Sequence, residues 1–138
     1  MLVQPYLSFE GRAEEAIEFY KKAVGAQVTM LMRFNETPEQ PPPGMMPAGS
    51  ERKIMHSSMT IGDTVVMATD GYCSGKSKFD GISLALTAKD DAEAKRLFDN
   101  LAEGGEVTMP LNKTFFASSF GMLKDSFGVP WMVVTQGP

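Results

Sequence analysis

The chain has little cysteine and comparatively few basic side chains. Cys73 is its only cysteine, so no disulfide can form within the chain, and a reducing cytoplasm is the expected setting. There are 13 Lys and Arg against 17 Asp and Glu, and the net charge of −4 argues against nucleic acid or an anionic membrane as partner. No apolar run approaches the roughly 20 residues that span a bilayer, and no signal-peptide pattern opens the chain.

Histidine is equally scarce, whereas methionine is abundant. His56 is the only histidine, and there are 11 methionines. Because the methionine side chain is flexible and fits irregular gaps, we interpret most of these residues as adaptable core filler rather than as a binding surface. The length of 138 residues and the hydrophobic content of 43% indicate one globular domain or two small packed modules.

The first half of the chain combines one helix pattern with four strand patterns. Apolar residues at helical spacing predict a helix over Ala13–Val24, and Gly25 is a suitable stop. The five prolines within residues 35–50 exclude a helix or an interior strand there, so this segment is expected to be a surface loop. Strands are predicted over Leu2–Phe9, Ala26–Phe34, Lys53–Ile61 and Thr64–Thr69.

The same order of elements begins again after the connection Asp70–Asp80. A strand over Gly81–Thr87 precedes a helix that starts at the N-cap Asp90, with Glu93 completing a capping box, and ends at Gly104-Gly105. A strand then starts over Glu106–Met109. The last element is a predicted hairpin over Thr114–Thr135 with its turn at Asp125–Gly128, and its strand-type residues are Phe115, Phe116, Phe120, Met122, Val129, Trp131, Val133 and Val134.

The two halves therefore repeat one pattern. We predict an α+β fold of two βαβββ modules, residues 1–70 and 80–138, each sheet covered on one side by its helix. The other side is expected to curve round a cavity, which is the default ligand site. The pairs of matching segments are Ala16–Tyr20 with Ala94–Phe98, Val28–Met30 with Val107–Met109, and Ser57–Met59 with Ser118–Phe120.

Several short motifs point to a known family. They are Pro5–Phe9 with Gly11, Glu15–Tyr20, Ile54–His56, Ile61–Asp63, Thr114-Phe115, Phe120-Gly121 and Asp125–Met132. On these residues the chain resembles the vicinal oxygen chelate superfamily of glyoxalases, extradiol dioxygenases and bleomycin-resistance proteins, and within it the PhnB-like branch. The resemblance implies the paired-module fold and a homodimer, in which the two chains could exchange modules. Members of this branch have been labelled demethylubiquinone methyltransferases, but the sequence shows no Gly-rich βα loop for a methyl donor.

The resemblance also locates a metal site in the metal-using relatives, which hold a divalent ion with one residue from the first and last strand of each module. The corresponding positions here are Gln4, Met67, Ile82 and Val133. Only the Gln4 oxygen suits such an ion, because a thioether is a soft ligand and the other two side chains carry no ligand atom. A register shift of one residue would add only Ser83. We therefore predict no family-type metal site and no cofactor.

His56 is the obvious acid–base candidate, because its unperturbed pKa lies near neutrality. It is expected to share a strand face with Ile54, Ser58 and Thr60, where it could equally be a half-exposed residue with a hydrogen-bonded ring. Tyr6, on the same face as Gln4, could turn its hydroxyl into the cavity.

Phe116, Phe120 and Trp131 could stack on a planar ligand, or could simply form core or dimer contacts. Cys73 is expected to be a spectator thiol, since no adjacent base would ionise it. The predicted ligand-binding residues are Gln4, Tyr6, Ser58, Met67, Phe116, Phe120 and Trp131.

Two functions remain open at this stage. One is a metal-free protein that binds a small molecule in the cavity. The other is a glyoxalase-like lyase or isomerase, or a dioxygenase-type enzyme, that uses His56 as acid, base or atypical metal ligand.

Overall fold

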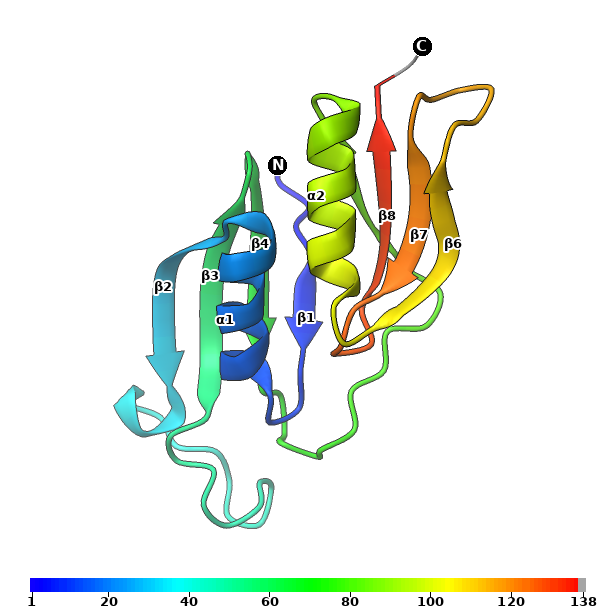
Figure 1. The fold of residues 1–138 in the computed structure, drawn as a ribbon. Helices are drawn as coiled ribbons and strands as arrows, with labels where there is room; N and C mark the ends of the chain where they lie inside the picture. Colours follow the sequence, from blue (N-terminus) through cyan, green and yellow to red (C-terminus); the bar gives the residue numbers. More distant parts are fainter. Residues whose placement is uncertain (137–138) are drawn as a thin grey trace. The chain divides into compact units, whose positions relative to one another are not determined.

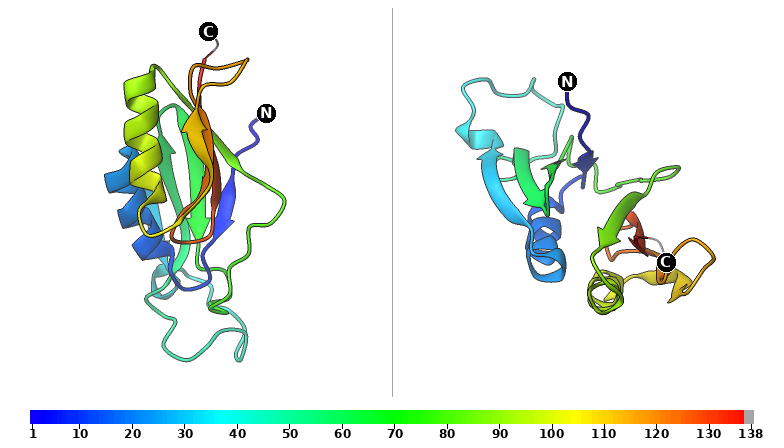
Figure 2. Two further views of the ribbon diagram at one scale, coloured as in Figure 1. Left: turned by 45° about the vertical axis from the view of Figure 1, so that its right-hand side comes forward. Right: turned by 90° about the horizontal axis from the view of Figure 1, so that it is seen from above.

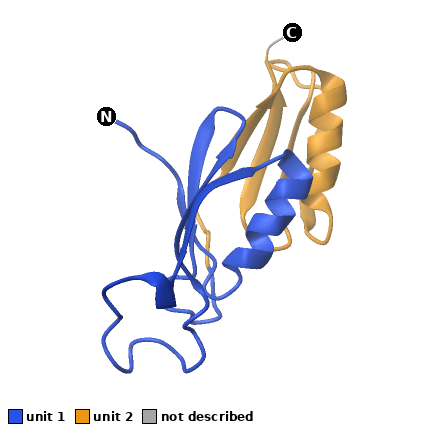
Figure 3. Cartoon of the chain, turned by 90° about the vertical axis from the view of Figure 1, so that its left-hand side faces the viewer, with its two compact units in different colours: residues 1–77 blue, residues 78–138 orange. Residues whose placement is uncertain are grey.

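The computed structural model describes residues 1–136, and the chain forms two compact units (Figure 3). Unit 1 ends at Ser77 and unit 2 begins at Lys78, so the division lies inside the connection that follows the first repeat. Within residues 1–136, neither helix combines the length and the hydropathy that crossing a membrane requires.

Unit 1 is a four-stranded mixed sheet with one helix (Figure 1). The strand order is β1-β4-β3-β2, with β1 parallel to β4 and the other pairs antiparallel. Helix α1 packs against β3 and β4 and covers one face of the sheet (Figure 2). Its elements are β1 (Tyr6–Ser8), α1 (Ala13–Val24), β2 (Gln27–Arg33), the short 3₁₀ helix η1 (Phe34–Glu36), β3 (Ile54–Ile61) and β4 (Thr64–Thr69).

Unit 2 repeats this topology with the strand order β5-β8-β7-β6. Strands β5 and β8 are parallel, the other pairs are antiparallel, and α2 contacts all four strands. The predicted α+β fold of two βαβββ modules is confirmed, and neither sheet closes on itself. The elements are β5 (Leu84–Ala88), α2 (Asp91–Ala102), β6 (Glu106–Asn112), β7 (Phe120–Lys124) and β8 (Pro130–Thr135).

The helix ends follow the predicted local chemistry. Helix α1 has Glu14 and Glu15 in its first turn and ends at Gly25, which adopts the left-handed conformation with φ of 69°. Helix α2 begins at Asp90, whose carboxylate accepts a hydrogen bond of 2.8 Å from the Glu93 backbone N–H. Both helices therefore start and stop where the sequence predicts.

Each unit has its core between the helix and the sheet. In unit 1, Tyr20 of α1 and Met59 of β3 are fully buried. In unit 2, Phe98 of α2 packs against the backbone of β7, because a Cβ atom built on Gly121 would lie 2.8 Å from the Phe98 ring. Gly121 thus admits the Phe98 ring, which is only 5% exposed.

The strand register supports one of the predicted matches between the two halves and contradicts another. Val28–Met30 and Val107–Met109 both contain a register irregularity after the valine, which confirms their match. The match of the two serine pairs is wrong. Ser57 pairs with Ala68 inside the β3–β4 ladder, whereas Ser118 and Ser119 precede β7.

Several strands differ from their predicted bounds, and β5 begins at Leu84 rather than at Gly81. Strand β1 begins at Tyr6 rather than at Leu2. Phe115 and Phe116 lie in the loop before β7, because the Thr114 hydroxyl accepts a bond of 3.1 Å from the Ala117 N–H and closes a local turn there. Strand β6 extends through Pro110 to Asn112, which an edge strand tolerates.

Candidate functional site

The face of the unit 1 sheet that α1 leaves uncovered carries most of the predicted site residues. On β4, Val66 and Ala68 are buried, so Met67 between them points to the opposite, open face. The pairing register places Tyr6 beside Met67, Met67 beside Ser58, and Ser58 beside Met30. This cross-strand row brings three predicted ligand-binding residues together, and Gln4 lies two residues before Tyr6.

Tyr6 and His56 contact each other directly on this open face. The Tyr6 hydroxyl lies 3.2 Å from His56 Nδ1, and the two rings meet edge to face with centroids 5.4 Å apart. The contact joins residues that are 50 positions apart in the chain. Because the hydroxyl can donate or accept, it suits either imidazole tautomer and leaves Nε2 as the second nitrogen that can exchange a proton.

A bulge in β3 places His56 on a different face of the strand from Ile54, contrary to the prediction. Arg33 pairs with Ile54 and Met32 pairs with His56, so Met55 is an extra residue in the ladder. Ile54 is fully buried while His56 is half-buried. Ile54 therefore lies on the opposite face from His56. Ser58 and Thr60 are half-buried and lie on the same face as His56, as predicted.

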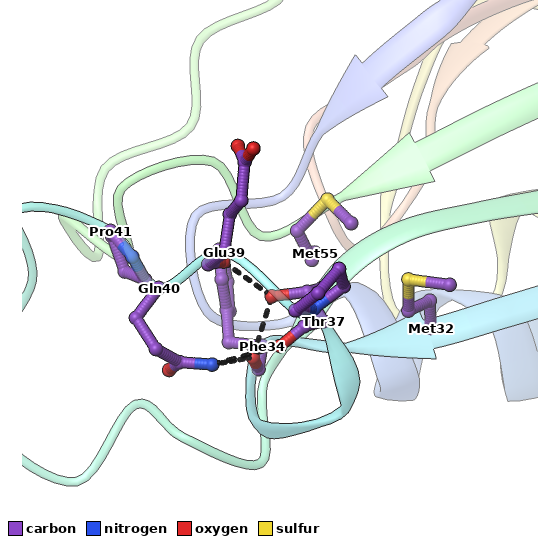
Figure 4. A pocket seen from close by; sticks show the side chains of 8 residues that line it. Met32, Phe34, Thr37, Glu39, Gln40, Pro41 and Met55 are labelled. Atoms are coloured by element: carbon purple, nitrogen blue, oxygen red, sulfur yellow. Dashed lines mark hydrogen bonds between the residues drawn. The ribbon is translucent and has the colours of Figure 1, made fainter.

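A hollow of about 440 Å³ lies at the end of β2 and β3 (Figure 4). It adjoins His56, because Met32 is the cross-strand partner of that residue and Met55 is its neighbour in the chain. It is lined by Met32, Phe34, Thr37, Pro38, Glu39, Gln40, Pro41 and Met55.

Local hydrogen bonds hold the proline-rich wall of this hollow. The Thr37 hydroxyl donates to the Glu39 carbonyl at 2.6 Å, and the Gln40 side-chain amide donates to the Thr37 carbonyl at 3.1 Å (Figure 4). The segment is a surface loop, as predicted, but its first residues after η1 form an ordered turn. This turn contributes Thr37, Pro38, Glu39, Gln40 and Pro41 to the lining of the hollow.

The methionines show where the prediction of core filler fails. Met59 is the one buried methionine of the 11, and the other ten are half-buried or exposed. In unit 1 they gather on the open face and at the hollow, as Met30, Met32, Met55 and Met67. The alternation Met30-Leu31-Met32 already placed two of them on one strand face, but it did not say which face α1 covers.

The basic side chains of Arg33 and Lys53, at the end of β2 and just before β3, both have hydrogen-bond partners. Arg33 forms an ion pair of 2.9 Å with Glu14, and its guanidinium also donates to the Arg52 carbonyl at 2.7 Å. The hydrogen bonds that Arg33 donates to the Glu14 carboxylate raise the pKa of Arg33 and lower the pKa of Glu14. Lys53 donates to the Gly11 carbonyl at 2.8 Å. These side chains fix the ends of β2 and β3.

A second carboxylate, Glu10, fastens the end of β1 to the connection that follows β4. Its side chain accepts bonds from the Ser8 hydroxyl and the Ser74 N–H. Partial burial acts to raise the pKa of Glu10, but these hydrogen bonds together outweigh it and leave the pKa below its ordinary value. Cys73 lies in the same connection, and burial raises the pKa of its thiol, as expected for a thiol without an activating base.

In unit 2 the three predicted aromatic residues divide between the two faces. The Phe116 and Phe120 rings are 5.1 Å apart, so the structure brings this pair together. Trp131 lies on the other face, under α2, where it is 3% exposed and its indole N–H donates to Asp125 at 2.9 Å. The strand alternation in β8 separates Trp131 from the open face, and this placement does not support a ligand contact.

The four positions that the resemblance assigns to a metal site do not supply a set of ligands for an ion. Val133 is fully buried on the α2 side, and Ile82 precedes β5 with 54% exposure. Gln4 and Met67 offer one amide oxygen and one thioether. Within residues 1–136, no three His, Cys, Asp or Glu side chains gather in a way that could hold a metal ion.

Comparison with known proteins identifies the family. The model of the family described as 3-demethylubiquinone-9 3-methyltransferase matches residues 2–134. The chain belongs to this family. Protein YjdN of Escherichia coli K12 is 38% identical over 147 residues, which cover 100% of this chain and 99% of that protein. The PhnB-like resemblance is thereby confirmed.

Solved structures that are similar to this chain share its fold. Protein PA1353 from Pseudomonas aeruginosa is 39% identical with a TM-score of 0.84, covering 99% of this chain and 98% of that one. A Bacillus cereus structure titled as a putative 3-demethylubiquinone-9 3-methyltransferase, PhnB protein, is 28% identical with a TM-score of 0.79, covering 98% and 99%. A glyoxylase/bleomycin resistance protein/dioxygenase domain from Frankia, 10% identical with a TM-score of 0.69 and covering 99% and 97%, shows the superfamily fold alone.

Proposed function

We propose that this PhnB-like protein binds a small molecule on the open face of unit 1. The apolar part of the ligand occupies the hollow beside Met32 and Met55, and its polar part reaches Tyr6 and His56. The observation that carries the proposal is the Tyr6–His56 hydrogen bond of 3.2 Å, because His56 pairs across the strands with Met32, which lines the hollow. Paired polar side chains beside an apolar hollow are the usual composition of a ligand site.

The size and lining of the hollow support this proposal. Its volume of about 440 Å³ lies within the range of roughly 300–1,000 Å³ that is typical of small-molecule sites. Thioether side chains adapt their shape to different apolar bodies, which suits a binding protein. Tyr6 and His56 can both donate and accept hydrogen bonds, and so fix the orientation of a polar group.

The methyltransferase description of the family is not the function that we propose. A protein that holds a methyl donor on a βα unit needs a glycine-rich turn between strand and helix. The turns here are residues 9–12 in unit 1 and residues 89–90 in unit 2, and they contain a single glycine, Gly11. The site geometry instead favours binding on the open sheet face.

The test is a screen of metabolites by thermal shift, followed by calorimetry on the compounds that stabilise the protein. Tyr6→Phe and His56→Gln should each weaken binding about tenfold, the equivalent of one lost hydrogen bond. Tyr72→Phe, at an exposed tyrosine in the connection, is the matched control and should leave affinity unchanged. A screen without any stabilising compound, or equal affinities for the Tyr6 and Tyr72 variants, would contradict the proposal.

A second candidate is an enzyme in which His56 transfers a proton. The Tyr6 hydroxyl fixes Nδ1 and leaves Nε2 for the reaction, which favours this candidate. In that case His56→Gln should retain binding but abolish turnover of a compound found in the screen, as followed by mass spectrometry. A compound that is bound and recovered unchanged by the wild-type protein argues for binding alone.

A further inference from the structure

We infer that the ligand of the unit 1 hollow carries a positive charge attached to its apolar body. This inference rests on the proposed function and adds the charge of the ligand to it. Among the described residues that line the hollow, Glu39 is the one charged side chain, and none of the others is basic. The hollow therefore has the lining of a site for an organic cation.

The Glu39 carboxylate is available to such a ligand. Its backbone carbonyl accepts from Thr37, but the carboxylate itself forms no hydrogen bond or ion pair within residues 1–136. Figure 4 shows the carboxylate standing clear of the hydrogen-bonded turn below it. Charged carboxylates on a protein surface need no partner, so this geometry leaves Glu39 free to attract a cation that enters the hollow.

The nearest basic residues along the chain do not offer a competing site for an anion. Arg33 precedes the lining residue Phe34, but its guanidinium is bound to Glu14 and to the Arg52 carbonyl. Lys53 precedes β3 and is bound to the Gly11 carbonyl. An anionic ligand would meet the Glu39 carboxylate in a lining that contains no basic side chain, so its affinity should be the lowest of the three charge types.

The remaining lining residues also suit an organic cation. The face of the Phe34 ring attracts ammonium groups through its negative quadrupole. The Met32 and Met55 thioethers are polarisable and pack against N-alkyl or aromatic groups. An inorganic cation would gain little here, because a single carboxylate and thioethers do not satisfy a hard ion. The chemical class is an amine or alkylammonium with an apolar body.

Three probes that share one skeleton test the inference. These are 4-phenylbutylamine, 4-phenylbutanol and 4-phenylbutyrate, titrated by NMR up to ~10 mM at low ionic strength. The amine should bind wild-type protein roughly fivefold tighter than the alcohol, which is the magnitude of an exposed ion pair. The butyrate should bind most weakly. Added salt at about 0.5 M should reduce the preference for the amine, because salt screens exposed charges.

Glu39→Gln should remove the preference for the amine without changing the affinity for the alcohol. Glu51→Gln, at an exposed carboxylate outside the lining, is the matched control and should keep the preference. Equal binding of amine and alcohol by the wild-type protein, an unchanged preference in Glu39→Gln, or no binding of the amine would each overturn the inference. The metabolite screen decides separately on the proposed function, which survives if uncharged compounds bind.

Discussion

The Asp70 carboxylate connects the end of β4 to the start of α1 and to the start of β3. Asp70 is 1% exposed, and its carboxylate accepts three backbone hydrogen bonds, from Gly11 and Ala13 at 2.9 and 2.8 Å and from Ile54 at 2.8 Å. Helix α1 has no side-chain cap of its own at Arg12. Asp70 supplies that cap from the end of β4 and joins it to the start of β3, next to the bulge that positions His56.

Replacing Asp70 with alanine should destabilise unit 1 by about 3 kcal/mol or more, because three backbone N–H groups would lose their acceptor. The measurement is the urea unfolding midpoint followed by circular dichroism. Asp63→Ala, at an exposed residue of the β3–β4 turn, is the control and should change stability by less than about 1 kcal/mol. Equal losses for the two variants would show that the Asp70 bonds contribute little.

Asp91 should make stability depend on pH through its hydrogen bonds from the Ser118 and Ser119 hydroxyls, at 2.6 and 2.7 Å. These bonds lower the pKa of Asp91, so they stabilise the fold above the ordinary pKa of the carboxyl group and are lost as pH falls through its lowered pKa. Ser118→Ala should therefore be less stable than wild type at pH 7, and the difference should shrink below about pH 4.

The check is chemical denaturation of wild type and Ser118→Ala at pH 7 and pH 3, together with an NMR titration of the Asp91 carboxyl. The NMR pKa should rise in the variant. Ser77→Ala, at an exposed serine of the connection, should follow the wild-type curve at both pH values. A Ser118→Ala deficit that stays constant with pH would assign the effect to packing instead.

At the scale of elements, the sequence predicts helices better than strand details. Helix ends carry their own signals, such as Asp90 and Gly25, and both helices were placed correctly. Strand faces depend on register, and the extra residue Met55 has no signature in the sequence. For that reason the sequence predicted His56 on one face with Ser58 and Thr60, but it did not predict the burial of Ile54 or the contact between His56 and Tyr6.

The packing of α2 on β7 depends on the absence of a side chain at Gly121. A Cβ atom there would lie 2.8 Å from the Phe98 ring and 2.9 Å from Leu111 Cα. We expect Gly121→Ala to destabilise unit 2 by about 1–3 kcal/mol through overpacking. Thermal unfolding measures the loss, and combining the change with Phe98→Leu should cost less than the sum of the single variants. Strictly additive losses would show that the two residues do not contact each other.

At the scale of the whole molecule, the sequence predicted the duplication, but it predicted the candidate ligand site only in part. The repeat is a matter of order and spacing, and the Val-Thr-Met segments preserve even the same irregularity in both units. The hollow is different, because Phe34 and Glu39 meet Met55 only after the proline-rich turn folds back. The face on which Trp131 lies was not predictable for a similar reason. Side chains alternate between the two faces along β8, so a shift of one residue in the register would move Trp131 to the other face.

The uncovered sheet faces lead to the last prediction, which is that two copies of the chain associate. Met30 and Met109 occupy corresponding edge-strand positions in the two units and are 41% and 45% exposed. Apolar side chains on an open sheet face gain free energy when a second surface removes them from water. The βαβββ unit covers only one face by itself, so we propose a homodimer. Light scattering at about 10 µM should give a mass near twice 15.0 kDa.

Met30→Glu should shift this equilibrium toward the monomer, because a buried interface would have to desolvate the new carboxylate. Met30 belongs to the row of Tyr6, Met67 and Ser58, one row away from His56 and Met32, so the hollow itself is not altered. Lys22→Glu, on the exposed side of α1, introduces the same side chain away from the open face and should leave the mass unchanged. A monomeric mass for the wild-type chain would refute the dimer. A dimer that survives in Met30→Glu would instead locate the interface away from this row.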